Sequence, residues 1–134
     1  MSTECTCVTG IVGTEHSLAF EVNESDFASE LGSGDLQVLG TPRLVAWMES
    51  VTVALLERTQ EPRCTSLGIH VDVRHQAPSI QGDHLEIIAR VEEVTGSKIN
   101  FSTKAMSHGQ EVGVATITRA HVNREKFLRR VAES

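Results

Sequence analysis

The sequence has few aromatic residues, few cysteines and no long hydrophobic run. Tyrosine is absent, and one tryptophan and four phenylalanines make up the 4% aromatic content of the 134 residues. No window approaches the roughly 20 apolar residues that a membrane-spanning helix needs. The first ten residues, MSTECTCVTG, have neither the basic start nor the apolar core of a secretory signal. We therefore expect a cytoplasmic protein that makes no use of a membrane.

Cysteine occurs three times, at positions 5, 7 and 64. Three cysteines cannot all pair among themselves, so in a cytoplasmic protein we expect Cys5, Cys7 and Cys64 to be free thiols. Cys5 and Cys7 are closely spaced, but they are not accompanied by the second pair of Cys or His ligands that a zinc site uses. No metal and no redox cofactor is expected.

Positive charge is scarce, since the net charge is −6 and residues 1–40 contain seven acids but no Lys or Arg. A protein that binds nucleic acid through its phosphates usually has a basic face and a high pI, whereas this pI is about 5.5. The basic stretch NREKFLRR at 123–130 fits a solvated amphipathic end helix, or a contact with a small anionic cofactor. Nucleic acid is therefore not an expected partner.

The length and composition are those of one folded domain. A chain of 134 residues can bury a sufficient core without disulfides or metal ions. A content of 40% hydrophobic and 22% charged residues is ordinary for a globular protein. We expect a single domain over 1–134, with residues 1–10 as a loose N-terminal segment.

Five segments alternate apolar and polar residues with the period of a half-buried strand. They are SLAFEV at 17–22, TSLGIHVDVRHQ at 65–76, DHLEIIARVEEV at 83–94, KINFSTKAM at 98–106 and EVGVATITRAHV at 111–122. TGS and SHGQ are short hairpin links between the last three. The segment 23–35, NESDFASELGSGD, predicts one helical turn and a loop long enough to act as a lid.

A long helix is predicted from Thr41 to about Thr59, with Thr41 as N-cap and Pro42 as its first residue. Its polar stripe is thin, and more than half of its circumference is apolar: Leu44, Val45, Trp47, Met48, Val51, Ala54, Leu55 and Leu56. The order β-α-β-β-β-β therefore predicts an α+β protein, in which a twisted five-stranded antiparallel sheet wraps around one long helix.

Glu49 is a carboxylate among the apolar residues of this helix, with Val45, Val53 and Leu56 as its helical neighbours. A buried carboxylate needs partners or takes up a proton more readily, and such a group suits general-base catalysis near neutral pH. The alternative is a carboxylate that reaches solvent at the helix flank or pairs with a nearby arginine. The pattern alone leaves both interpretations open.

Three further positions lie where they can serve a site. Thr41 is explained by capping alone, but a helix start also presents the backbone N–H groups of Arg43 and Leu44 to a developing oxyanion. His75 shares a strand face with Leu67, Ile69, Val71 and Val73, as a core-edge histidine or as a proton donor or acceptor. Gly68, on the opposite face, indicates a β-bulge or a ligand close to the backbone.

Three stretches together, ELGSGDLQVLGTPRLVAWME, SLGIHVDVRHQAP and ATITRAHVNREKF, resemble the hotdog-fold thioesterases related to the fluoroacetyl-CoA-specific thioesterase. The resemblance covers nearly the whole chain after residue 10. It implies a hotdog fold with a short C-terminal helix, and a homodimer with active sites at the dimer interface, with a tetramer left open. It also implies a catalytic group of Thr41, Glu49 and His75 and a substrate-positioning glycine at Gly68.

The function that follows from the resemblance is hydrolysis of the thioester of a small or medium acyl-CoA, with CoA as part of the substrate. Glu49 would be the general base, Thr41 the nucleophile or the hydroxyl that positions water, and His75 an assisting group. Arg43 would bind substrate at the helix start, and Arg119, Arg124 or Lys126 would meet the CoA phosphates. The segment ELGSGDLQVLG lacks the aromatic residues of the lid in the fluoroacetyl-CoA enzyme, so fluoroacetyl selectivity is not predicted.

Two other functions fit the same fold. One is a domain that binds acyl-CoA without turning it over, as a sensor or carrier. The other is a hydratase or dehydratase acting on an enoyl-CoA. Hydrolysis is preferred because Thr41, Glu49 and His75 resemble the thioesterase group, and no Asp-His signature of the hydratase branch is present.

Overall fold

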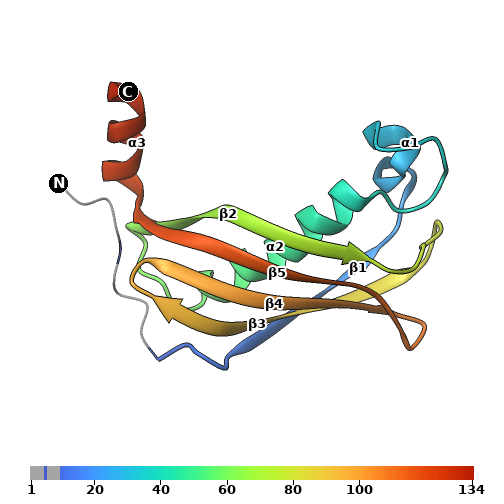
Figure 1. The fold of residues 1–134 in the computed structure, drawn as a ribbon, viewed down its shortest axis with the longest axis horizontal. Coiled ribbons are helices and arrows are strands. Elements are labelled where there is room, and N and C mark those ends of the chain that lie inside the picture. Colours follow the sequence, from blue (N-terminus) through green and yellow to red (C-terminus); the bar gives the residue numbers. More distant parts are fainter. Residues whose placement is uncertain (1–4, 6–9) are drawn as a thin grey trace.

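The computed structural model describes residue 5 and residues 10–134. The predicted loose segment, apart from Cys5 and Gly10, and the predicted thiol of Cys7 lie outside the described residues. Five antiparallel strands form one sheet in the order β1-β3-β4-β5-β2 (Figure 1). Their bounds are β1 Glu15–Glu21, β2 Cys64–His75, β3 His84–Thr95, β4 Lys98–Ser107 and β5 Gln110–Asn123. The predicted strands and their antiparallel pairing are confirmed.

Two tight hairpins join β3, β4 and β5. Thr95 pairs with Lys98, and Ser107 pairs with Gln110, so each link has two residues. In the second link both His108 (φ 52°) and Gly109 (φ 71°) have positive φ. Turns of this kind follow the natural twist of paired strands, which explains why the links could be located from sequence.

The long helix α2, Thr41–Glu57, crosses one face of the sheet (Figure 1). Its buried apolar side chains recur every three or four residues and pack on the inward residues of the sheet. They are Leu44, Met48, Val51, Leu55 and Leu56. The rings of Trp47 and Phe20 of β1 stack with centroids 4.8 Å apart. The sheet covers one side of α2, and Val45, Glu49 and Val53 are only half-buried.

The start of α2 differs by one residue from the prediction. Gly40 is the N-cap, and Thr41 is the first helical residue, with its hydroxyl making no capping hydrogen bond. The helix ends at Glu57 rather than Thr59. Thr41 is not the cap because its hydroxyl is directed to a partner on β2 instead.

The segment before α2 is folded against the helix start. It contains the short helices η1, Glu24–Asp26, and α1, Ala28–Leu31, so the predicted helical turn is confirmed. Asp26, 7% exposed, accepts from Asn23 N–H through Oδ2 and pairs with the Arg43 guanidinium at 3.0 Å through Oδ1. Its own carbonyl accepts from Gly40 N–H. The segment is thus tied to the first turn of α2.

A bulge interrupts the edge strand β2 between Gly68 and His70. The extra residue reverses the phase of the side chains, because successive strand residues point to opposite faces. Leu67, next to the helix-facing Gly68, therefore points to the other face, and its predicted place beside Val71, Val73 and His75 is wrong. Leu67 and Ile69 are 36% and 51% exposed. The bulge brings Gly68 onto the helix-facing side that His75 also occupies, which corrects its predicted position on the opposite face.

Cys5 and Cys64 form a disulfide, so the prediction of free thiols is wrong for both. The bridge ties the N-terminal segment to the start of β2, where Cys5 N–H also donates to the carbonyl of His121. Nothing in the sequence indicated this pairing, because the two cysteines are 59 positions apart, with a strand and the long helix between them.

The C-terminal helix α3, Arg124–Glu133, extends from the end of β5 away from the sheet (Figure 1). The Asn123 side chain caps it by accepting from Lys126 N–H at 3.0 Å. None of its residues is buried, in agreement with the predicted solvated end helix. Among the described residues, none of the helices has the length and apolar character that crossing a membrane requires.

Candidate active site

Thr41 and His75 are in direct contact. The Thr41 hydroxyl lies 2.7 Å from His75 Nδ1, which joins the start of α2 to the end of β2. Burial lowers the pKa of His75 below its ordinary value, so the imidazole is neutral at neutral pH. His75 Nε2 is buried and has no hydrogen-bond partner among the described residues.

A hollow of about 310 Å³ lies beside this pair. It is lined by Thr41 and His75, by Gly40 and other residues of 28–40, and by residues 76–78 that follow β2. The predicted lid segment thus forms one wall of a cavity at the start of the long helix. A small ligand in the hollow would meet the hydroxyl of Thr41.

The backbone at the helix start offers fewer donors than predicted. Both Arg43 N–H and Leu44 N–H donate to the carbonyl of Gly40, at 3.0 and 3.1 Å, so the prediction that they are free is wrong. The side chain of Arg43 is engaged by Asp26. Thr41 N–H, in contrast, has no partner among the described residues. One N–H group without a described partner therefore lies at the positive end of the helix dipole, on a residue that lines the hollow.

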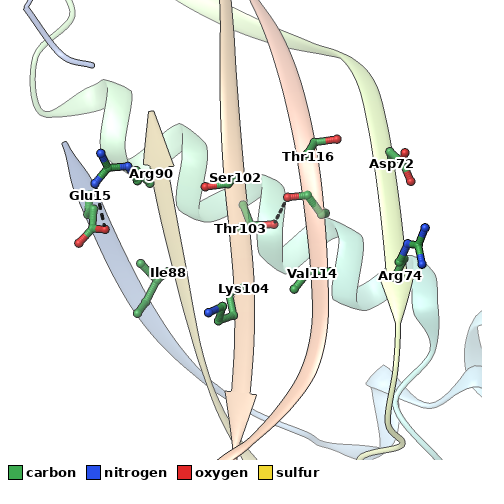
Figure 2. Close-up of a pocket in the computed structure, with 11 residues that line it drawn as sticks. Glu15, Asp72, Arg74, Ile88, Arg90, Ser102, Thr103, Lys104, Val114 and Thr116 are labelled. Atoms are coloured by element: carbon green, nitrogen blue, oxygen red, sulfur yellow. Dashed lines mark hydrogen bonds and ion pairs between the residues drawn. The ribbon is translucent and has the colours of Figure 1, made fainter. Parts of the chain in front are cut away.

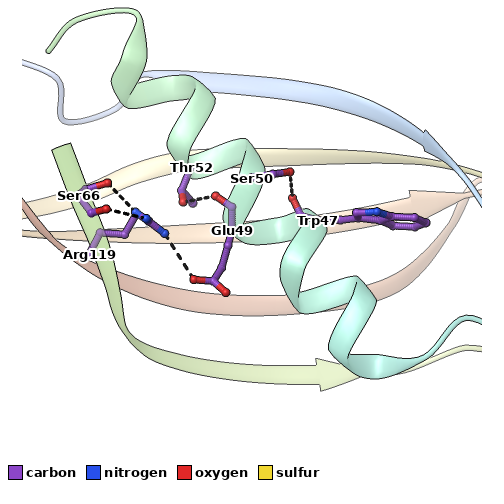
Figure 3. A network of polar contacts seen from close by, with 6 residues as sticks. All are labelled: Trp47, Glu49, Ser50, Thr52, Ser66 and Arg119. Carbon is purple, nitrogen blue, oxygen red and sulfur yellow. Dashed lines mark hydrogen bonds and ion pairs between the residues drawn. The ribbon is translucent and has the colours of Figure 1, made fainter. Parts of the chain in front are cut away.

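Glu49 lies two turns further along α2, in a second polar group. Its Oε2 is 3.4 Å from Nη1 of Arg119 on β5, as Figure 3 shows. The Glu49 side chain is 35% exposed and the Arg119 side chain 7%. The carboxylate is thus paired with an arginine and partly open to solvent, which is the alternative that the sequence left open.

Arg119 is held from two sides. Its Nε donates to Ser66 Oγ at 2.8 Å and its Nη2 to the Ser66 carbonyl at 3.2 Å (Figure 3). Burial lowers the pKa of Arg119 and the neighbouring Glu49 opposes that shift, so the guanidinium stays charged. Three of its nitrogen atoms are engaged in fixing one orientation toward Glu49.

Gly68 leaves the room that the carboxylate occupies. A Cβ added at Gly68 would overlap with Oε2 of Glu49 and lie 3.4 Å from Nη1 of Arg119. Gly68 also pairs directly with Arg119 across β2 and β5. Among the predicted site residues, the structure therefore brings Gly68, Glu49 and Arg119 together, and brings Thr41 together with His75.

Sequence reasoning missed Ser66 and Asp26, and it missed the contact between Arg119 and Glu49. A signal for Arg119 was available, because the alternation Ala115, Ile117, Arg119 and His121 puts it on the buried face of β5. A charged residue on that face needs a partner. Asp26 had no such signal, since its burial comes from the fold of the loop.

A larger hollow, of about 510 Å³, lies on the sheet face turned away from α2 (Figure 2). Arg74, Arg90 and Lys104 line it together with Glu15 and Asp72. None of the predicted site residues lines it. The site described above is therefore separate from this larger hollow.

The architecture and the site define a class: a hotdog-fold protein of the thioesterase kind. In structure the chain is similar to a hot-dog-like protein from Thermanaerovibrio acidaminovorans (TM-score 0.84, 24% identity, 91% of this chain and 90% of that one). It is also similar to the fluoroacetyl-CoA thioesterase FlK (TM-score 0.84, 26% identity, 92% of this chain and 96% of that one). The predicted hotdog fold is confirmed.

The sequence comparisons agree with this class. The family model of the fluoroacetyl-CoA-specific thioesterases matches residues 22–125. The fluoroacetyl-CoA thioesterase of Streptantibioticus cattleyicolor is 29% identical over 97 residues, which are 72% of this chain and 70% of that protein. The chain belongs to the fluoroacetyl-CoA-specific thioesterase family, and it is a thioester hydrolase.

Proposed function

We propose that the protein hydrolyses the thioester of a small or medium acyl-CoA, as a homodimer. The observation that carries this proposal is the 2.7 Å contact between the Thr41 hydroxyl and His75 Nδ1 at the wall of the hollow beside α2. Related solved structures are described as complexes of the fluoroacetyl-CoA thioesterase with acetyl-CoA, and with fluoroacetate and CoA. A small acyl group on CoA is therefore the substrate class that fits.

Thr41 and His75 act on the carbonyl. Neutral His75 accepts the proton of the Thr41 hydroxyl through Nδ1, and this hydroxyl either attacks the thioester carbon or orients the water that does. Thr41 N–H and the helix dipole stabilise the negative charge that develops on the carbonyl oxygen. If Thr41 attacks, His75 passes the proton to the sulfur of the departing CoA and an acyl-threonine remains, which water then hydrolyses to the free acid and Thr41. If water attacks, the proton taken from it goes to the sulfur, and acid and free thiol form directly.

Glu49 is the general base for water. Arg119 and Gly68 hold its carboxylate against β2, and its partly exposed side chain gives water access to the second oxygen. Arg119 positions Glu49 in this proposal and does not meet the CoA phosphates, because its guanidinium is buried. Arg124 and Lys126 are exposed near the end of β5 and stay available for the phosphates.

The homodimer completes the site. Thr41 and Glu49 are eight residues apart on one helix, which corresponds to about 12 Å along its axis at 1.5 Å per residue. One carbonyl group cannot contact both from the same chain without a large displacement. The edge strand β2 carries exposed Leu67 and Ile69 beside Gly68, and exposed apolar edge strands tend to pair with another chain. Pairing there lets Glu49 of one protomer approach Thr41 and His75 of its partner.

The direct test is release of free thiol from acyl-CoAs of increasing chain length. We expect turnover by the wild type, and a loss of about 10²–10⁴-fold in kcat for Glu49→Gln, which is the usual contribution of a general base. Thr41→Ala should lose a similar factor while both variants keep the wild-type circular dichroism spectrum. Binding without thiol release would identify a carrier or sensor instead. Loss of enoyl absorbance with the thioester intact would identify a hydratase.

A further inference from the structure

A second cluster of reactive side chains lies at the opposite end of β2 from His75. Cys5, Cys64 and His121 come from the N-terminal segment, the start of β2 and the end of β5, and their ligand atoms all lie within 4.8 Å of one another. Their exposed fractions are 6%, 1% and 0%. The two cysteines form the disulfide described above. This cluster plays no part in the proposed thioester chemistry.

We propose that the reduced form of this cluster is a zinc site, with the Cys5 and Cys64 thiolates and the His121 imidazole as ligands. Zinc binds thiolate at about 2.3 Å and imidazole at about 2.0 Å, so that tetrahedral ligand atoms lie roughly 3.5–3.8 Å apart. The three ligand atoms lie within 4.8 Å of one another, and once the S–S bond is broken the two sulfurs can separate to that spacing. Two thiolates and one imidazole are a donor set that zinc accepts, with the fourth position open to water or another oxygen.

The surroundings of His121 favour a metal. Nδ1 lies 3.2 Å from the carbonyl oxygen of Cys5, and Nε2 lies 3.1 Å from Oε1 of Gln60. A neutral imidazole ring carries a single N–H. Two acceptors therefore face one donor in this arrangement. A zinc ion satisfies the second nitrogen, while the first donates to an oxygen, which is the usual support of a zinc-bound histidine.

The two states are connected by a balanced reaction. A reductant of the dithiol or phosphine class gives two electrons to the disulfide, the S–S bond breaks, and two protons from water complete the thiols. Zinc then binds the two sulfurs and the imidazole and releases both thiol protons. In the reverse direction an oxidant of the disulfide class accepts two electrons from the two thiolates, the S–S bond forms again, and Zn²⁺ is released. The cluster thereby exchanges a covalent link for a metal link between the N-terminal segment and the sheet.

The test uses the full chain, reduced with a phosphine and desalted without oxygen, with Co²⁺ as a spectroscopic probe for zinc. We expect one Co²⁺ per chain, with thiolate-to-metal absorption and the visible bands of tetrahedral cobalt, displaced by Zn²⁺. His108→Asn, at an exposed histidine of the hairpin between β4 and β5, should behave like the wild type. Cys64→Ser should lose the absorption, and His121→Asn should bind at least about tenfold more weakly, because one ligand is removed. The oxidised wild type should bind none.

The proposal is overturned by reduced wild type that gives no tetrahedral cobalt bands, since a disulfide alone then explains the cluster. It is equally overturned by undiminished binding in Cys64→Ser, or by loss of binding in His108→Asn. His121→Asn keeps both cysteines, so its oxidised form, compared with the oxidised wild type by circular dichroism, separates loss of a ligand from loss of the fold.

Discussion

At the scale of single residues, the site depends on a glycine that gives space to a carboxylate. Gly68 lies against Oε2 of Glu49, and Arg119 holds the same oxygen from β5. The half-exposed carboxylate has no other anchor among the described contacts of its side chain. The direction of this one group is therefore decided by the absence of one methyl group and the presence of one guanidinium.

Gly68→Ala should displace Glu49 without unfolding the protein. The added methyl group overlaps with the end of a flexible side chain, which can rotate toward solvent, so little stability is lost. We expect kcat to fall by about tenfold or more, since a small misplacement of a catalytic group has large effects. In the Glu49→Gln background the same change should cost much less, because the group to be displaced is no longer a base. An equal loss in both backgrounds would assign Gly68 to substrate binding alone.

His75 should make stability depend on pH below neutrality. Burial lowers its pKa in the folded state, whereas in the unfolded chain it is about 6.5. Between these two values the unfolded chain binds more protons, so the free energy of unfolding decreases as the pH falls below about 6.5. His121 contributes in the same direction. Urea titrations at several pH values should show a flatter dependence for His75→Gln, and an unchanged slope would contradict the assignment.

At the scale of secondary-structure elements, the sequence predicted the regular helix and strands and missed the β-bulge that interrupts one strand. The strands β3, β4 and β5 and the helix α2 follow regular periods, so their positions agree with the structure within about two residues. The bulge between Gly68 and His70 follows no repeating pattern in the sequence. The prediction therefore assigned Leu67 to the wrong face of the sheet. The candidate site was affected in the same way, because the position of Gly68 beside Glu49 depends on that shift.

Shortening side chains on the two sides of α2 should show which side is buried. Leu56 is fully buried between the helix and the sheet, while Val53, three residues earlier, is only half-buried. Leu56→Ala should lower the free energy of unfolding by about 2–5 kcal/mol, which is typical of a cavity in a core. Val53→Ala should cost clearly less. Chemical denaturation of both variants measures this, and similar losses would mean that the half-exposed side of α2 is covered by another chain.

At the scale of the whole molecule, the two polar groups of the site lie too far apart along α2 to act together on one bond. Thr41 with His75, and Glu49 with Arg119, are each internally connected, and no hydrogen bond or ion pair joins them among the described residues. The lid segment forms a wall beside Thr41 and His75. Gly68 of the edge strand β2 lies beside Glu49. A second copy of the chain is the simplest way to bring the groups together, because a twofold axis can place Glu49 of one chain beside Thr41 of the other.

Mixing two inactive subunits tests this arrangement. If a site combines Thr41 of one chain with Glu49 of its partner, a heterodimer of Thr41→Ala and Glu49→Gln has one intact site and one doubly altered site. Random reassociation of equal amounts makes half of the dimers heterodimers, so the mixture should recover about a quarter of the wild-type activity. Each variant alone, unfolded and refolded in the same way, is the control. Recovery of no activity, with heterodimers verified by mass spectrometry, would place the complete site within one chain and would require α2 or the lid segment to move during catalysis.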